Sequence, residues 1–168
     1  MQKFLKYIFI LIFTLILQVT IFSYYPVNGI KPDLLLVVVV ISSLISGSSM
    51  GIKTGFGAGT LQDVFLGGIF GKYTISKILI GSISGIFSGK IYKKNYIFPP
   101  LLIFGVTLIQ ENLIILLSKK ILFNINYLET LGNIILFEAI YNGLLGLLLY
   151  PIFLKIFRIG DRKSWTID

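Results

Sequence analysis

Three acidic residues interrupt the long apolar stretches of this sequence, and their side chains are the best placed for chemistry. They are Asp63, Glu111 and Glu138. A carboxylate at the centre of a bilayer costs about 2.5–3.5 kcal/mol on insertion scales, so such residues normally face the interior of a helix bundle and find partners there. With a helical rise of about 1.5 Å per residue, all three are expected in the middle-to-outer half of a membrane. The basic residue expected at a similar depth is Lys77.

These residues predict a buried polar network in which Lys77 is the counter-charge. Such a network could be structural glue that fixes helix register, a ligand pocket or partner groove that opens outward, or a proton or ion path. Three carboxylates could also bind a hard cation, whereas no nucleophile–base pair marks a catalytic site. The amide side chains that could complete the hydrogen bonds of this polar network are Gln62, Gln110, Asn112, Asn133 and Asn142.

The composition places these side chains in a membrane rather than in a soluble core. Apolar residues make up 55% of the 168 residues and charged residues 13%, against about 25% charged in soluble domains. The mean hydropathy is +0.91. One soluble core of this size could not bury so much apolar surface. The chain has no Cys and no His, which excludes disulfides and zinc-thiolate sites and removes the commonest general base. We expect no cofactor and no bound metal.

The apolar blocks predict an all-α integral membrane protein with six transmembrane helices. They form a single domain over residues 1–158, followed by a short cytoplasmic tail over 159–168. The net charge of +8 comes from residues that flank apolar spans, which indicates contact with membrane lipid and not with nucleic acid. With the N-terminus inside, ten basic residues lie inside and five outside, so both termini are expected in the cytoplasm. The predicted spans are 4–22, 33–46, 50–66, 73–88, 97–117 and 131–156.

Glycines recur at every fourth position in the third and fourth predicted spans. This spacing places small residues in one stripe along a helix, where a neighbouring backbone can approach closely. We therefore expect these two spans to pack tightly, and against each other. The glycines are Gly47, Gly51, Gly55 and Gly59 in the first stretch and Gly81, Gly85 and Gly89 in the second.

The order of these features resembles the rod shape-determining protein MreD family over about residues 1–158. The second span opens with Lys-Pro-Asp-Leu-Leu-Leu, a Gly-rich run ends in Gln-Asp, and a lysine then begins a helix that ends in Gly-Ile-Phe-Ser-Gly. An acid in the fifth span also fits. The residues that match the family motif are Pro32, Asp33, Gln62 and Asp63.

This resemblance implies a non-enzymatic scaffold of the bacterial cell-elongation (rod) complex in the cytoplasmic membrane. It implies a fold like that of the substrate-binding subunit of energy-coupling-factor transporters. The implied partners are an MreC-like single-pass membrane protein, the actin-like MreB, and a RodA-type glycosyltransferase with its transpeptidase. The implied role is support of side-wall peptidoglycan synthesis, cell wall organisation and cell shape.

Two other functions remain open from the sequence. A substrate-binding subunit of a vitamin transporter would carry a stripe of small residues on its first helix and aromatic residues in its pocket. The first span here has no such stripe. A channel or ion carrier would produce conductance or proton flux in liposomes.

Overall fold

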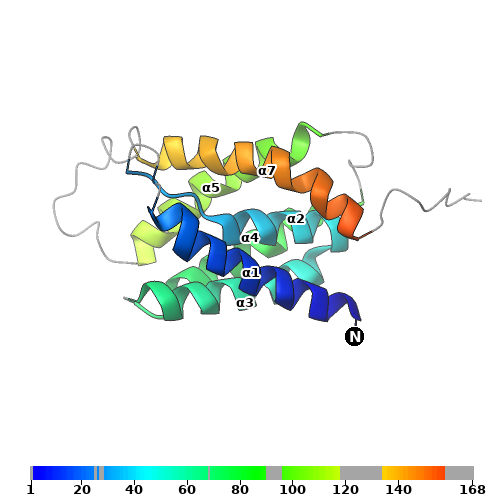
Figure 1. The fold of residues 1–168 in the computed structure, drawn as a ribbon, viewed down its shortest axis with the longest axis horizontal. Helices are drawn as coiled ribbons and strands as arrows, with labels where there is room; N and C mark the ends of the chain where they lie inside the picture. The colour runs from blue at the N-terminus through cyan, green and yellow to red at the C-terminus, as the bar shows by residue number, and fades with distance from the viewer. Residues whose placement is uncertain are drawn as a thin grey trace, which may run out of the picture.

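Six helices run back and forth along one common direction in the computed structural model, and they confirm the all-α prediction (Figure 1). The structure describes residues 2–24, 26, 29–67, 69–89, 96–117 and 134–157. The N-terminus and the end of the last helix lie at the same end of the bundle. The tail predicted at 159–168 lies outside the described residues. The helices are α1 (Gln2–Tyr24), α2 (Leu34–Ser46), α3 (Ser48–Leu66), α4 (Lys72–Ile86), α5 (Phe98–Leu117) and α7 (Leu136–Ile156).

Three of the described helices are long and apolar enough to cross a membrane, namely α1 over Lys6–Tyr24, α5 and α7. The apolar helix α2 has 13 residues and is therefore about 20 Å long, and α4 with 15 residues is about 23 Å long. The hydrocarbon core of a bilayer is about 30 Å thick. The chain is thus a membrane protein, while the count of six crossings stays a prediction.

The helix α2 lies at the centre of the bundle. Every residue from Leu34 to Leu44 is buried, and α2 contacts each of the other five described helices. Its run of four valines would suit a buried strand in a soluble protein. Here a helix forms because its backbone groups bond within the segment, which an apolar environment requires.

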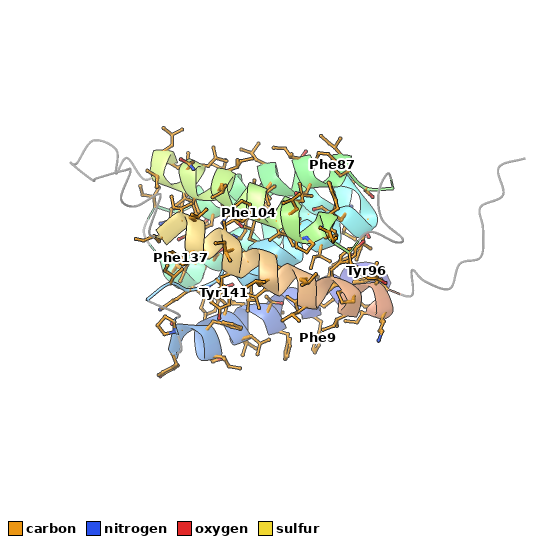
Figure 2. The ribbon with its side chains drawn as sticks, turned by 90° about the horizontal axis from the view of Figure 1, so that it is seen from above. Phe9, Phe87, Tyr96, Phe104, Phe137 and Tyr141 are labelled. Carbon is orange, nitrogen blue, oxygen red and sulfur yellow. The ribbon has the colours of Figure 1, made fainter. Side chains whose placement is uncertain are left out.

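The outer surface of the bundle is apolar. Phe9 on α1 is 72% exposed and Leu148 on α7 is 64% exposed. In Figure 2, apolar side chains cover the outside of the bundle, and Phe9 points away from it. A surface of this kind is suited to lipid or to another membrane helix.

The glycine stripes lie between α3 and α4, where the two backbones meet. A Cβ added at Gly51 would lie 2.7 Å from the carbonyl carbon of Gly81, and one added at Gly55 would lie 2.8 Å from that of Lys77. Real Cβ atoms essentially never come so close, so these positions need glycine. The same applies to Gly59 against the backbone of Thr74 and to Gly85 against that of Ser48.

Gly47 and Gly89 have a different role from the one their spacing predicts. They have φ values of +86° and +82°, in the region that favours glycine over residues with a Cβ. Gly47 joins α2 to α3, and Gly89 follows the end of α4. They mark the ends of helices and do not take part in the close packing.

Candidate functional site

A buried ion pair between Lys77 and Asp33 lies at the centre of the polar site. The Lys77 side chain is completely buried and that of Asp33 is 5% exposed. Asp33 directly precedes α2, and its carboxylate accepts a hydrogen bond from the backbone N–H of Leu36 at 3.0 Å. It thereby caps the N-terminus of α2, where a negative charge is favourable. One carboxylate therefore serves both as helix cap and as partner of the buried lysine.

Two glutamines surround this ion pair. Gln110 of α5 donates its Nε2 to Asp33 Oδ2 at 2.9 Å and accepts a hydrogen bond from Lys77 Nζ at 3.2 Å. Gln62 of α3 donates its Nε2 to the same Asp33 oxygen at 3.4 Å. The Oε1 atom of Gln62 is buried and has no hydrogen-bond partner among the described residues. The pair is therefore held from α3 and α5 as well as from α2 and α4.

Asn142 links α7 to the same site. Its Oδ1 accepts a hydrogen bond from the backbone N–H of Asp33 at 2.9 Å, and its Nδ2 donates to Thr107 Oγ1 on α5 at 3.3 Å. Both side chains are completely buried. Five helices thus meet in one hydrogen-bonded network formed by Asp33, Gln62, Lys77, Thr107, Gln110 and Asn142, which we call the Asp33–Lys77 network.

Asp63 lies outside the Asp33–Lys77 network, although the sequence predicted it there. Its carboxylate accepts hydrogen bonds from the backbone N–H groups of Gly71, Tyr73 and Thr74 at 3.0–3.1 Å and from the Thr74 hydroxyl at 2.6 Å. These groups belong to the first turn of α4, whose N–H groups have no partners within the helix. The short connection between α3 and α4 brings Asp63 to this turn, so it caps α4 instead of pairing with Lys77.

Glu111 and Glu138 line a cavity of about 270 Å³ at the end of the bundle where α2 begins. Glu111 accepts one long hydrogen bond, from Gln110 Nε2 at 3.5 Å. No hydrogen bond or ion pair reaches Glu138 from the described residues. Side chains from or next to all six described helices reach this space, which we call the acidic cavity. Its polar lining includes Gln18, Lys31, Asp33, Gln62, Tyr73, Glu111 and Glu138.

Two further amide side chains were predicted to complete the hydrogen bonds of the polar network, those of Asn112 and Asn133. Asn112 donates its Nδ2 to the carbonyl oxygen of Leu108 on its own helix at 2.7 Å, and Asn133 lies outside the described residues. Pro32 is buried and lines the acidic cavity. The sequence had marked Asp33 as a motif residue but not as the partner of Lys77, and it missed Thr107. One signal in the sequence could have placed Asp33 in the site. A carboxylate just before an apolar helix is a typical N-cap, and Asp33 directly precedes the apolar run of α2.

Comparison with known proteins gives one family. No curated protein and no solved structure shows a significant match. The family model described as rod shape-determining protein MreD matches residues 1–159, nearly the whole chain. The matched range contains every residue of the Asp33–Lys77 network and of the acidic cavity. The chain therefore belongs to the MreD family of rod shape-determining membrane proteins.

Proposed function

We propose that the chain is a non-enzymatic scaffold subunit of the bacterial cell-elongation complex. In this proposal it binds the membrane helix of an MreC-like single-pass protein and supports side-wall peptidoglycan synthesis together with MreB, a RodA-type glycosyltransferase and its transpeptidase. The observation that carries the proposal is the MreD family match over residues 1–159. A role in determining rod shape follows from membership, whereas the particular partners are our inference.

The internal bonding of the bundle supports a scaffold role. Lys77 and Asp33 are bonded to each other and to groups on neighbouring helices. Hydrogen bonds and an ion pair that join several helices in this way hold the bundle in one arrangement. A bundle held in this way offers its outer surface to partners, and that surface is apolar over α1 and α7. Another membrane helix would be held there by close packing.

The first experiment is a mild-detergent pull-down of the tagged protein from its own host, followed by mass spectrometry. We expect an MreC-like protein and wall-synthesis enzymes. Paired ATPases with a coupling subunit would instead identify a vitamin importer. A photo-crosslinking residue at exposed Phe9 or Leu148 should then capture the MreC-like protein. The same residue at Leu35, which is completely buried, is the matched control and should capture nothing.

We also propose six membrane crossings in the cytoplasmic membrane with both termini in the cytoplasm. The supporting pattern is the excess of basic residues on one side. Because the chain has no cysteine, a single introduced cysteine can be labelled without background. A membrane-impermeant maleimide applied to intact spheroplasts should label Lys31→Cys. It should label Lys53→Cys only after the membrane is opened, and the reverse pattern would invert the topology.

A further inference from the structure

A groove of about 510 Å³ opens between α3 and α4 on the outer surface of the bundle. We call it the α3–α4 groove, and its lining consists of Ile52, Lys53 and Phe56 from α3 and Ile78 from α4. Ile52 is 42% exposed and Phe56 is 57% exposed, so the groove faces the surroundings of the bundle and not its core. Its volume lies within the range of about 300–1,000 Å³ that is typical of sites for small molecules.

The close approach of α3 to α4 positions the two walls of this groove. A Cβ added at Gly55 would lie 3.1 Å from the Cα atom of Ile78, so the two backbones meet at this point. Phe56 follows Gly55 along the chain, and it lines the groove opposite Ile78. The groove therefore depends on the same glycine packing that holds the helical hairpin together, and it is part of the fold.

Lys53 is the charged residue of an otherwise apolar lining. It is exposed, and no hydrogen bond or ion pair reaches its ammonium group from the described residues. It lies five residues beyond Ser48, where α3 begins, which is about 7.5 Å along the helix axis. From such a depth a lysine extends its apolar stem along the surface and places its charge at the membrane interface. The ammonium group is thus placed at the level of lipid headgroups, directly beside the apolar groove.

The described charges are divided between the two halves of the bundle. The start of α1 and the ends of α2 and α7 meet in one half, where the Tyr7 hydroxyl is 2.8 Å from Ser46 Oγ and the Tyr7 ring stacks on Phe157. The described lysines of this half are Lys6, Lys53 and Lys155. The opposite half holds the described carboxylates, which are those of Asp33, Asp63, Glu111 and Glu138. A counter-charge for Lys53 must therefore come from outside the described bundle, and it must be an anion.

We propose that the α3–α4 groove binds one anionic phospholipid. Its acyl chain lies against Ile52, Phe56 and Ile78, and its phosphate accepts hydrogen bonds from the Lys53 ammonium group. Basic pockets between membrane helices on the cytoplasmic side are typical sites for anionic headgroups. A partner helix suits the groove less well, because such contacts use small residues that let two backbones approach, and the groove is lined by large side chains. Binding does not depend on the scaffold role, and only its place in the cytoplasmic leaflet rests on the topology proposed above.

Native mass spectrometry of the purified full chain, titrated in detergent with dioleoyl phosphatidylglycerol, tests the proposal. Dioleoyl phosphatidylcholine is the matched control, because it has the same acyl chains and a phosphate but no net charge. We expect one phosphatidylglycerol per chain, bound at least about fivefold more tightly than phosphatidylcholine, which is the scale of one lysine near an anionic lipid. Equal binding of the two lipids, or no bound lipid, overturns the proposal.

Charge variants show whether Lys53 selects the headgroup. Lys53→Met removes the charge and keeps most of the apolar stem, so the affinity for phosphatidylglycerol should fall about fivefold, to that for phosphatidylcholine. Lys155→Met removes another exposed lysine of the same half, which does not line the groove, and the affinity should stay unchanged. Equal effects of the two variants overturn the proposal.

A space-filling variant shows whether the acyl chain lies in the groove. Ile52→Trp places a larger ring there and should weaken binding of both lipids. Leu79→Trp is the matched control, because Leu79 is 44% exposed on α4 and does not line the groove, and it should leave binding unchanged. If Ile52→Trp does not fold, the charge variants decide. Capture of another membrane protein by a photo-crosslinking residue at Phe56 in cells would assign the groove to that protein and overturn the proposal.

Discussion

Replacement of Lys77 by methionine tests whether the buried ion pair stabilises the bundle as the structure indicates. The change removes the ammonium group and keeps most of the side-chain volume. It leaves Asp33 as a buried carboxylate without its counter-charge. Loss of one partner from a buried ion pair costs about 3–5 kcal/mol in soluble proteins. Asp33 would still accept hydrogen bonds from Leu36 and Gln110 at 3.0 and 2.9 Å, so we expect the lower end, about 3 kcal/mol.

The assay is equilibrium unfolding of the purified protein in mixed detergent micelles with increasing dodecyl sulfate. Lys53→Met is the matched control, because Lys53 is exposed on α3 and should change the free energy of unfolding by less than about 0.5 kcal/mol. The double variant Asp33→Asn with Lys77→Met removes both charges and keeps a capping oxygen before α2. It should regain at least half of the lost stability, because the buried carboxylate is no longer unpaired.

Two results would refute this reasoning. If Lys77→Met destabilised the protein no more than Lys53→Met does, the buried pair would contribute nothing measurable. If the effects of Asp33→Asn and Lys77→Met simply added, the two side chains would not interact energetically. Residues in direct contact normally show coupling energies of about 0.5–3 kcal/mol in such a cycle.

Three further changes test other parts of the structure by the same unfolding assay. Gly55→Leu should cost at least about 3 kcal/mol or prevent folding, since overpacking already costs about 1–3 kcal/mol where side chains can adjust. Gly105→Leu, which enters open space, is its control, and equal tolerance of both would refute the close packing of α3 and α4. Asp63→Ala should lower the free energy of unfolding by about 1–2 kcal/mol through loss of the α4 cap; an unchanged value would mean that water replaces the carboxylate. Asn142→Leu leaves the buried N–H of Asp33 without an acceptor and should cost about 1–3 kcal/mol, whereas a neutral result would show that another acceptor takes its place.

Much of the fold could be predicted because apolar blocks and glycine spacing are local signals. A helix of apolar residues is indicated by its own composition, and the stripe of Gly51, Gly55 and Gly59 identifies a face on which a backbone can approach. The sequence also showed that Lys77 needs a buried partner, since a lysine within an apolar segment is costly. These inferences need no knowledge of how the helices are arranged.

The pairing within the site could not be predicted, because it depends on contacts between distant segments. Asp33 and Lys77 are 44 positions apart and Asp33 and Asn142 are 109 apart, and no spacing rule connects them. The expected depth in the membrane favoured Asp63 over Asp33 as the partner of Lys77. This prediction was wrong because Asp63 reaches the N-terminal turn of α4, which follows in the same helical hairpin and provides four hydrogen-bond donors. The Asp63 carboxylate therefore bonds to nearby backbone N–H groups and not to the more distant Lys77 ammonium group.

The burial of α2 has a consequence for how this protein meets its membrane. The most apolar of the described helices, α2, is buried from Leu34 to Leu44 and is the one enclosed by the others. Its hydrophobicity therefore serves packing and not solvation by lipid. A photoreactive fatty acyl chain should label α1 and α7 and leave α2 untouched. Removal of methyl groups from α2, as in Val39→Ala, should be harmful because it opens a void, while the same change at exposed Val19 meets fluid acyl chains that fill the space.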